Sequence, residues 1–208
     1  MHKRFIVISY RLAFGLLALV AVTVQFVQGF DRQGYNPVNF FHFFTIESNI
    51  FAAGILLLAG FAALKSKPHS DRFARLRGAA TVYMTVTGIV YVSLLSGLEA
   101  SLQTPTPWIN TVLHYVMPIV VLGDWLLMPP RRRIAFGRAA AWLVFPAAYG
   151  VYSLIRGHFV DWYPYPFLNP TEQGYAGVAM TGMVIAMAIV AIVWAVSQIP
   201  GWRSTRRR

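Results

Sequence analysis

The sequence predicts an all-α fold: an integral membrane bundle of six transmembrane helices that forms one domain over residues 1–208. Only 12% of the residues are charged and 57% are hydrophobic, whereas a soluble domain carries about 25% charged residues. Six apolar runs recur along the chain, and each is close to the ~20 residues that a helix needs to cross a membrane. The chain has no cysteine, which excludes a disulfide framework and a thiolate metal site.

The first three predicted spans cover residues 12–29, 44–64 and 77–98. The first follows "MHKR", as a signal peptide would, but its length and the lack of a small-residue cleavage site favour a retained helix. The second opens on the polar residues "TIESN" before it becomes apolar. The third carries small and hydroxyl side chains at helical spacing, a pattern that lets membrane helices pack closely. These residues are Thr81, Thr85, Gly88, Val92 and Ser96.

The last three predicted spans cover residues 108–128, 135–156 and 174–198. The fourth contains His114 and Asp124. Asp124 lies about 10 Å from the inner end of its helix, and we expect it to pair with a basic side chain at that rim. The sixth span follows the segment "DWYPYPFLNP", which is either an aromatic belt at the membrane interface or a lid over an outward-facing pocket.

The basic residues predict the orientation in the membrane. Of the 18 Lys and Arg side chains, all except Arg32 and Arg156 flank the predicted spans on one side. Both termini are therefore expected in the cytoplasm, and we expect the location to be a bacterial cytoplasmic membrane. The net charge of +11 is then explained by topology and by anionic lipid headgroups. Membrane lipids are the expected partners, nucleic acid is not, and the oligomeric state is left open.

Four polar side chains are predicted to lie at one depth. Counted along each helix from the nearest basic cluster at 1.5 Å per residue, Thr45, Glu47, His114 and Arg156 all lie about 25–30 Å from the inner boundary. That level is the outer edge of a hydrocarbon core about 30 Å thick. Ionisable residues inside a membrane are costly and commonly functional, so their shared depth predicts a site that faces the outer leaflet.

The residue types at this depth permit acyl transfer. A threonine hydroxyl needs an adjacent base to act as a nucleophile, and histidine is the usual base. Hydrogen-bond donors are needed for the developing oxyanion, and a third group can orient the imidazole. The predicted catalytic residues are Thr45 and His114, and the predicted supporting residues are Glu47, Asn49, Asn110, Tyr152 and Arg156.

Each of these residues also has a structural interpretation. Thr45 would serve as a helix N-cap, and Glu47 would be favoured at a helix start by the dipole. His114 would be a neutral imidazole bonded to a neighbour such as Asn110, and Arg156 would snorkel toward the membrane surface.

Three segments carry a resemblance to a known family: "FFTIESN" in the second span, "LHYVMPIVVLGDWLL" in the fourth and "WYPYPFLN" before the sixth. With the hydropathy and spacing of nearly the whole chain, they resemble a bacterial six-helix membrane family similar to the eukaryotic androgen-induced-gene proteins. Those proteins are multi-pass threonine hydrolases of fatty acid esters of hydroxy fatty acids. The resemblance implies Thr45 as nucleophile and His114 as base, acting on a lipid ester without a cofactor. Glu47 has no counterpart in the eukaryotic proteins, so the substrate of this chain is left open.

Other classes of function compete with this hypothesis. A transporter with a proton relay through Glu47, His114 and Arg156 is the main alternative, although the chain lacks the internal repeat and broken helices of many transporters. A haem or metal protein that uses His42 and His114 is a third, but no His-x-x-x-His motif is present and no metal site is expected. A scaffold would leave the buried charges unexplained.

Overall fold

The computed structural model describes residues 2–65, 70–99, 102, 106–130 and 133–205. The described residues form helices joined by turns, with no strand among them. The first half of the described chain contains α1 (His2–Gly29), α2 (Pro37–Phe40), α3 (Phe44–Leu64), α4 (Asp71–Val90) and the π-helix η1 (Tyr91–Leu95). The second half contains α5 (Pro107–Thr111), the π-helix η2 (Val112–Val116), α6 (Met117–Leu127), α7 (Phe136–Ala139), the 3₁₀-helix η3 (Ala140–Leu143), α8 (Val144–Val160), the 3₁₀-helix η4 (Pro166–Leu168) and α9 (Pro170–Thr205).

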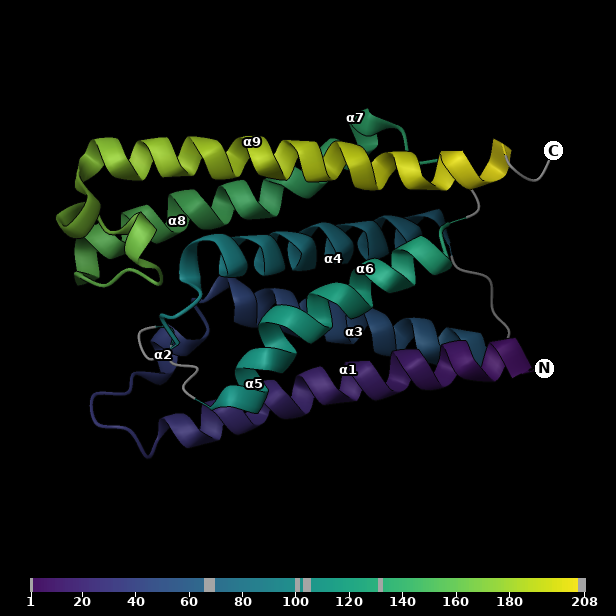
Figure 1. The fold of residues 1–208 in the computed structure, drawn as a ribbon, viewed down its shortest axis with the longest axis horizontal. Helices are drawn as coiled ribbons and strands as arrows, with labels where there is room; N and C mark the ends of the chain where they lie inside the picture. Colours follow the sequence, from purple (N-terminus) through teal and green to yellow (C-terminus); the bar gives the residue numbers. More distant parts are fainter. Residues whose placement is uncertain (1, 66–69, 100–101, 103–105, 131–132, 206–208) are drawn as a thin grey trace.

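The all-helical prediction is confirmed, and five of the described helical segments are long and apolar enough to cross a membrane. They are Arg4–Gly29, Phe44–Leu64, Asp71–Leu95, Pro107–Leu127 and Pro170–Ile199. Figure 1 shows α1, α3, α4, α6, α8 and α9 running roughly alongside one another, with the start of α1 and the end of α9 at the same end of the molecule.

The predicted span 135–156 is helical but not a single α-helix. It consists of α7, one 3₁₀ turn and then α8, which has 17 residues. Pro146 is the third residue of α8 and has no N–H to donate to a carbonyl in the preceding turn. That missing bond accounts for a change to 3₁₀ geometry before the α-helix begins. The number of six spans therefore stays a prediction.

Small residues allow α1 and α3 to lie close together. A Cβ added to Gly15 would come within 2.8 Å of Leu57, and one added to Gly60 would come within 2.7 Å of Leu12. Gly and Ala at such crossings let membrane helices approach until their backbones nearly touch.

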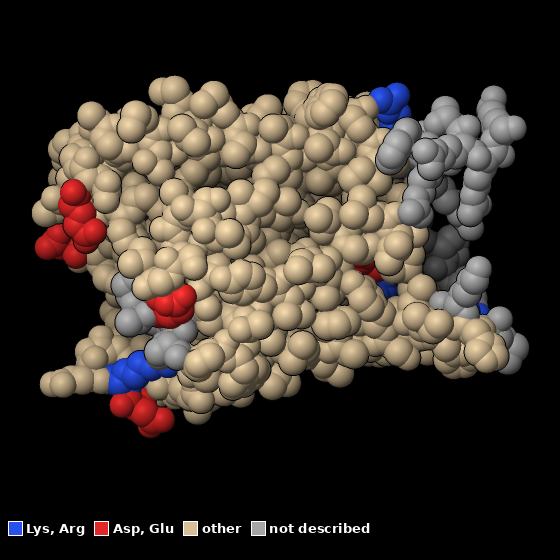
Figure 2. Space-filling model, in the orientation of Figure 1, with Lys and Arg blue, Asp and Glu red and all other residues tan. Residues whose placement is uncertain are grey.

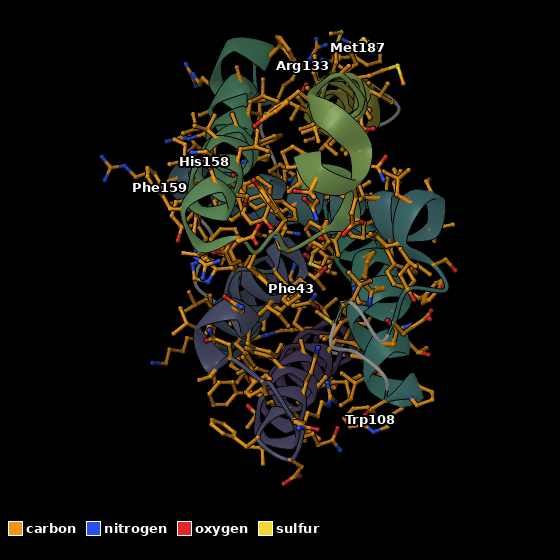
Figure 3. All side chains as sticks on the ribbon, turned by 90° about the vertical axis from the view of Figure 1, so that its left-hand side faces the viewer. Phe43, Trp108, Arg133, His158, Phe159 and Met187 are labelled. Atoms are coloured by element: carbon orange, nitrogen blue, oxygen red, sulfur yellow. The ribbon has the colours of Figure 1, made fainter. Side chains whose placement is uncertain are left out.

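The outer flanks of the bundle are apolar. Figure 2 shows the charged side chains of one face gathered at its two ends, with uncharged atoms between them apart from a small recessed patch. On the end view in Figure 3, Phe159 of α8 and Met187 of α9 point away from the bundle, and they are 80% and 60% exposed. Such exposed apolar flanks suit a lipid environment.

The small-residue stripe predicted on the third span packs only in part. Gly88 faces α6, where an added Cβ would come within 2.9 Å of Pro118, whereas Val92 is 58% exposed and Ser96 is also exposed. The change occurs at η1, because a π-helical turn holds one extra residue and rotates all later side chains around the axis.

The predicted pairing of Asp124 is confirmed, and it involves two arginines. Arg11 Nε lies 2.7 Å from Asp124 Oδ1, and Arg77 Nη2 lies 2.5 Å from Oδ2. All three side chains are 4–6% exposed, so the cluster is buried between the helices, close to the end of α6 at Leu127. It joins α1, α4 and α6.

Candidate active site around Thr45 and His114

Thr45 is buried in the first turn of α3, with a 6% exposed surface. The N-cap of this helix is Phe43, which makes no side-chain capping bond, so the interpretation of Thr45 as N-cap is wrong. The Thr45 N–H, which has no partner within the helix, instead donates to the hydroxyl of Tyr165 at 3.3 Å. The same hydroxyl lies 3.5 Å from Thr45 Oγ1.

Thr45 lines an apolar cavity of about 500 Å³ between α3, α4, α8 and α9. Its few polar groups are the hydroxyls of Thr45, Thr87, Tyr149 and Tyr165, and most of the other lining side chains are aliphatic or aromatic. The size lies in the usual range for small-ligand sites, which are mostly apolar with a few convergent polar groups. The cavity can hold an acyl chain with its polar end at Thr45.

The segment that was expected to be a belt or a lid contributes to this cavity. Tyr165 is 5% exposed and Leu168 is 8% exposed, and both line the cavity together with Phe167. Tyr163 lies against Gly157, where a Cβ would come within 2.1 Å of its ring. The segment therefore folds inward onto α3 and α8, which favours the lid interpretation.

His114 lies in η2 and is 3% exposed. Its Nδ1 lies 3.2 Å from the backbone oxygen of Asn110, so the structural interpretation that bonded it to Asn110 is confirmed for the backbone. Since a carbonyl oxygen only accepts, Nδ1 carries the proton and Nε2 keeps a lone pair, the tautomer required of a base. The ring stacks on Tyr91 with centroids 4.0 Å apart.

Both residues of this stacked pair belong to π-helical turns. Tyr91 begins η1 and His114 is the middle residue of η2. Pro118 follows η2 and cannot donate a hydrogen bond to the His114 carbonyl, which accounts for the wider turn before it. Isolated π-turns occur frequently at functional sites.

Asn49 connects the turn of Thr45 to the turn of His114. Its Nδ2 donates to the Thr45 carbonyl at 2.8 Å and to the Leu113 carbonyl at 3.2 Å, and the side chain is fully buried. One side chain therefore bridges the two backbones that carry the predicted nucleophile and base. No hydrogen bond joins Thr45 Oγ1 to His114 in the described part of the chain.

Asn110 belongs to a network with Tyr91 and does not contact Thr45 through a hydrogen bond among the described residues. Its Nδ2 donates to the Tyr91 hydroxyl at 2.6 Å, and that hydroxyl donates to Glu99 Oε1 at 2.8 Å. This network fixes the tyrosine on which His114 stacks, so Asn110 positions the imidazole from two directions.

Tyr152 and Arg156 hold the connection between α2 and α3. The Tyr152 hydroxyl lies 2.6 Å from His42 Nε2, and Arg156 Nη2 donates to Asn39 Oδ1 at 2.7 Å while stacking over Trp162. These contacts anchor the chain just before Thr45. They make both residues supports of the site's backbone.

Glu47 lies on another side of α3 from Thr45. Side chains two positions apart in a helix are separated by about 200° around its axis. Glu47 therefore lines a second, larger cavity and is not part of the lining of the cavity at Thr45. No hydrogen bond links it to His114 in the described structure, and its Oε2 is buried without a hydrogen-bond partner there.

Tyr91, Tyr149 and Tyr165 were not among the residues that the sequence predicted for the site, although Tyr149 shares a polar stripe at helical spacing with Tyr152 and Arg156. Tyr149 donates to the His42 carbonyl at 2.9 Å and accepts from the Phe44 N–H at 3.2 Å. The segment "WYPYPFLN" contains Tyr165, so its aromatic and proline-rich composition was a signal for this residue. No sequence pattern indicates the π-turn that brings Tyr91 to His114.

The described residues contain no group of three His, Asp or Glu side chains arranged to hold a metal ion. Both ring nitrogens of His42 are occupied, by the Val38 carbonyl and by Tyr152. Comparison with known families, curated proteins and solved structures found no match to this chain.

Proposed function

We propose that this chain is a membrane-embedded lipid ester hydrolase in which Thr45 is the nucleophile and His114 the base. The observation that supports this most directly is the position of Thr45: it is buried, makes no capping bond, and lines an apolar cavity that has few polar groups. A buried threonine in a helix usually bonds back to a carbonyl of its own helix, as Thr87 does with the Tyr83 carbonyl at 3.0 Å.

The proposed reaction proceeds by acyl transfer. Thr45 Oγ1 attacks the ester carbonyl while its proton passes to His114 Nε2. The proton then goes to the leaving alcohol, and water activated by the same imidazole hydrolyses the acyl-threonine. The Tyr165 hydroxyl, 3.5 Å from Oγ1, donates to the developing oxyanion. The base must approach Oγ1 when substrate binds, as is common for catalytic contacts that are long without ligand.

The substrate class follows from the cavity and from the resemblance. A largely apolar cavity with a few hydroxyl groups in its lining suits a fatty acyl ester, and fatty acid esters of hydroxy fatty acids are the first class to test. We place the six helices in a bacterial cytoplasmic membrane with both termini in the cytoplasm and the site toward the outer leaflet, because of the basic residues at one side of the predicted spans.

The test is covalent labelling of purified protein by a fluorophosphonate that carries an alkyl chain. Wild type should be labelled on Thr45, and Thr45→Ala and His114→Ala should each lose the label. Thr87→Ala is the matched control, because Thr87 lines the same cavity with its hydroxyl bonded to its own helix, and it should keep the label. Failure of folded wild type to react with probes of short and long chains, or loss of label in Thr87→Ala alone, would contradict the proposal.

The relay alternative has no comparable support. Glu47 lines the second cavity, His114 stacks on Tyr91, and Arg156 bonds Asn39. No hydrogen bond or ion pair connects Glu47, His114 and Arg156 within the described residues.

A further inference from the structure

A second cavity of about 1260 Å³ lies between α3, α4 and the α7–η3–α8 segment. We refer to it as the lateral groove. It is larger than the ~300–1000 Å³ typical of sites for small ligands. Its occupant should therefore be a large molecule.

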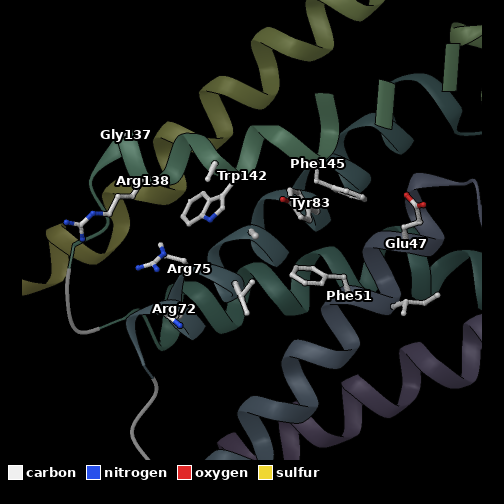
Figure 4. A pocket seen from close by; sticks show the side chains of 13 residues that line it. Glu47, Phe51, Arg72, Arg75, Tyr83, Gly137, Arg138, Trp142 and Phe145 are labelled. Carbon is white, nitrogen blue, oxygen red and sulfur yellow. The ribbon is translucent and has the colours of Figure 1, made fainter. Parts of the chain in front are cut away.

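The two ends of the lateral groove differ in charge. Figure 4 shows Arg72, Arg75 and Arg138 together at one end and Glu47 at the other. Arg72 and Arg75 come from the first turns of α4, and Arg138 comes from α7. The acidic residue of the lining is thus the one most distant from the guanidinium groups.

The walls between these ends are apolar and aromatic. Trp142, Phe145, Phe51 and Tyr83 lie along the groove in Figure 4. Small side chains leave the space between them, among them Ala141 of η3. The lining suits a hydrocarbon chain.

The length of the groove corresponds to one leaflet of a membrane. Its lining on α4 follows one face of the helix from Arg72 to Tyr83, which spans about 16 Å at 1.5 Å per residue. That is about half of a hydrocarbon core ~30 Å thick. A lipid whose headgroup sits at the arginine end would extend its chain just as far.

The three arginines are available to an anion. No hydrogen bond or ion pair engages the side chains of Arg72, Arg75 or Arg138 among the described residues, and Arg72 and Arg138 are exposed. Planar guanidinium groups bind phosphate oxygens in pairs. The positive charge of the three arginines suits a phosphate, and the apolar groove next to them suits an acyl chain. Together they point to a phospholipid.

We propose that the lateral groove binds one anionic glycerophospholipid, with its phosphate against Arg72, Arg75 and Arg138 and an acyl chain between Trp142 and Phe51. This site is separate from the cavity at Thr45 and does not depend on the proposed hydrolase. The lipid comes from the leaflet at the arginine end of the bundle.

The test is native mass spectrometry of the protein in neutral detergent with equal amounts of phosphatidylglycerol and phosphatidylcholine that carry the same acyl chains. Wild type should bind phosphatidylglycerol first. The double variant Arg75→Gln/Arg138→Gln should lose roughly fivefold in this preference for each charge removed. The matched control, Lys65→Gln/Arg133→Gln, removes two charges outside the groove lining and should keep the preference of wild type.

A second pair of variants tests the acyl chain. Ala141→Trp fills the groove and should reduce binding of both lipids. Gly137→Leu does the same at the arginine end, where a Cβ would meet no atom within 4 Å, so the fold should tolerate it. Glycerol phosphate, which has the anionic group without chains, should not displace the lipid.

Several results would overturn the proposal. They are equal binding of the two lipids by wild type, the same loss in the control variant, and unchanged binding in both filled variants. Displacement by glycerol phosphate would indicate a simple anion site. A dimer mass that disappears in Gly137→Leu would indicate that a second copy covers the groove.

Discussion

The buried cluster of Asp124 with Arg11 and Arg77 makes a sharp prediction about stability. Asp124 is the partner of both arginines, and its own surface is 4% exposed. The change Asp124→Asn therefore leaves two buried guanidinium groups without a counter-charge. Removing one partner of a buried ion pair costs about 3–5 kcal/mol, and we expect this change to reach that range.

Removal of Arg11 should cost much less. After Arg11→Met, Asp124 keeps Arg77 at 2.5 Å, so one balanced pair remains in the bundle. The large cost of removing one partner of a buried ion pair comes from the charge that is left without a counter-charge, and Arg11→Met leaves none. We therefore expect about 1 kcal/mol or less for Arg11→Met, and Arg11→Met combined with Asp124→Asn should recover part of the loss of Asp124→Asn, because one stranded charge has been removed.

Arg77 should be intermediate. Besides Asp124 it donates to the Met128 carbonyl at 2.9 Å and lies over Trp125 at 5.7 Å. Unfolding of all these variants in mixed micelles can be followed by the loss of helical circular dichroism. If Asp124→Asn costs no more than Arg11→Met, the two arginines do not depend on this carboxylate and the reasoning fails.

Three further predictions concern packing, hydrogen bonding and pH. Gly78→Ala should lower the free energy of unfolding by about 1–3 kcal/mol, because its Cβ would come within 2.2 Å of Trp142. In Gly54→Ala the Cβ would meet no atom within 4 Å, so the free energy of unfolding should stay the same or rise by about 0.5–1 kcal/mol. Thermal unfolding compares the two variants, and equal shifts in melting temperature would contradict the packing. Asn49→Ala removes two buried hydrogen bonds and should lower the free energy of unfolding by about 1–3 kcal/mol, as measured by chemical unfolding. An unchanged free energy of unfolding would show that Asn49 does not join α3 to η2. Burial raises the pKa of Tyr165 above its ordinary 10.0, so the unfolded chain releases this proton first and the free energy of unfolding falls as the pH rises past 10. Tyr165→Phe should make that fall smaller in unfolding measured as a function of pH. The same dependence on pH in both proteins would show that the hydroxyl is not buried.

The helices were predictable because long apolar runs mark them. Apolar runs of about 20 residues are long enough to cross a membrane as helices, and the predicted span 44–64 coincides with α3 (Phe44–Leu64). The run 12–29 corresponds to α1, which begins ten residues earlier at His2. Backbone hydrogen bonding continues the helix through the residues before the apolar run, whereas hydropathy marks only the run itself.

The sequence predicts the height of the candidate site residues along their helices but not the direction in which they face. Counting residues gives height along a helix and no information about rotation around it, so Thr45 and Glu47 were grouped together although they line different cavities. The π-turn at η1 adds a rotation that no sequence pattern signals, whereas the π-turn at η2, where His114 stacks on Tyr91, has Pro118 as its signal in the sequence.

The site depends on a helix start that is capped from elsewhere in the chain. The first turn of any α-helix has N–H groups without partners, and the side chain of the N-cap residue commonly accepts from one of them. The N-cap of α3 is Phe43, which makes no such bond. In this chain Tyr165 accepts from the Thr45 N–H and Tyr149 accepts from the Phe44 N–H. Two tyrosines from other segments therefore supply the cap that Phe43 cannot provide. One of them, Tyr165, also lies 3.5 Å from Thr45 Oγ1, so the group that caps the helix is the same group that the proposed chemistry uses as an oxyanion donor.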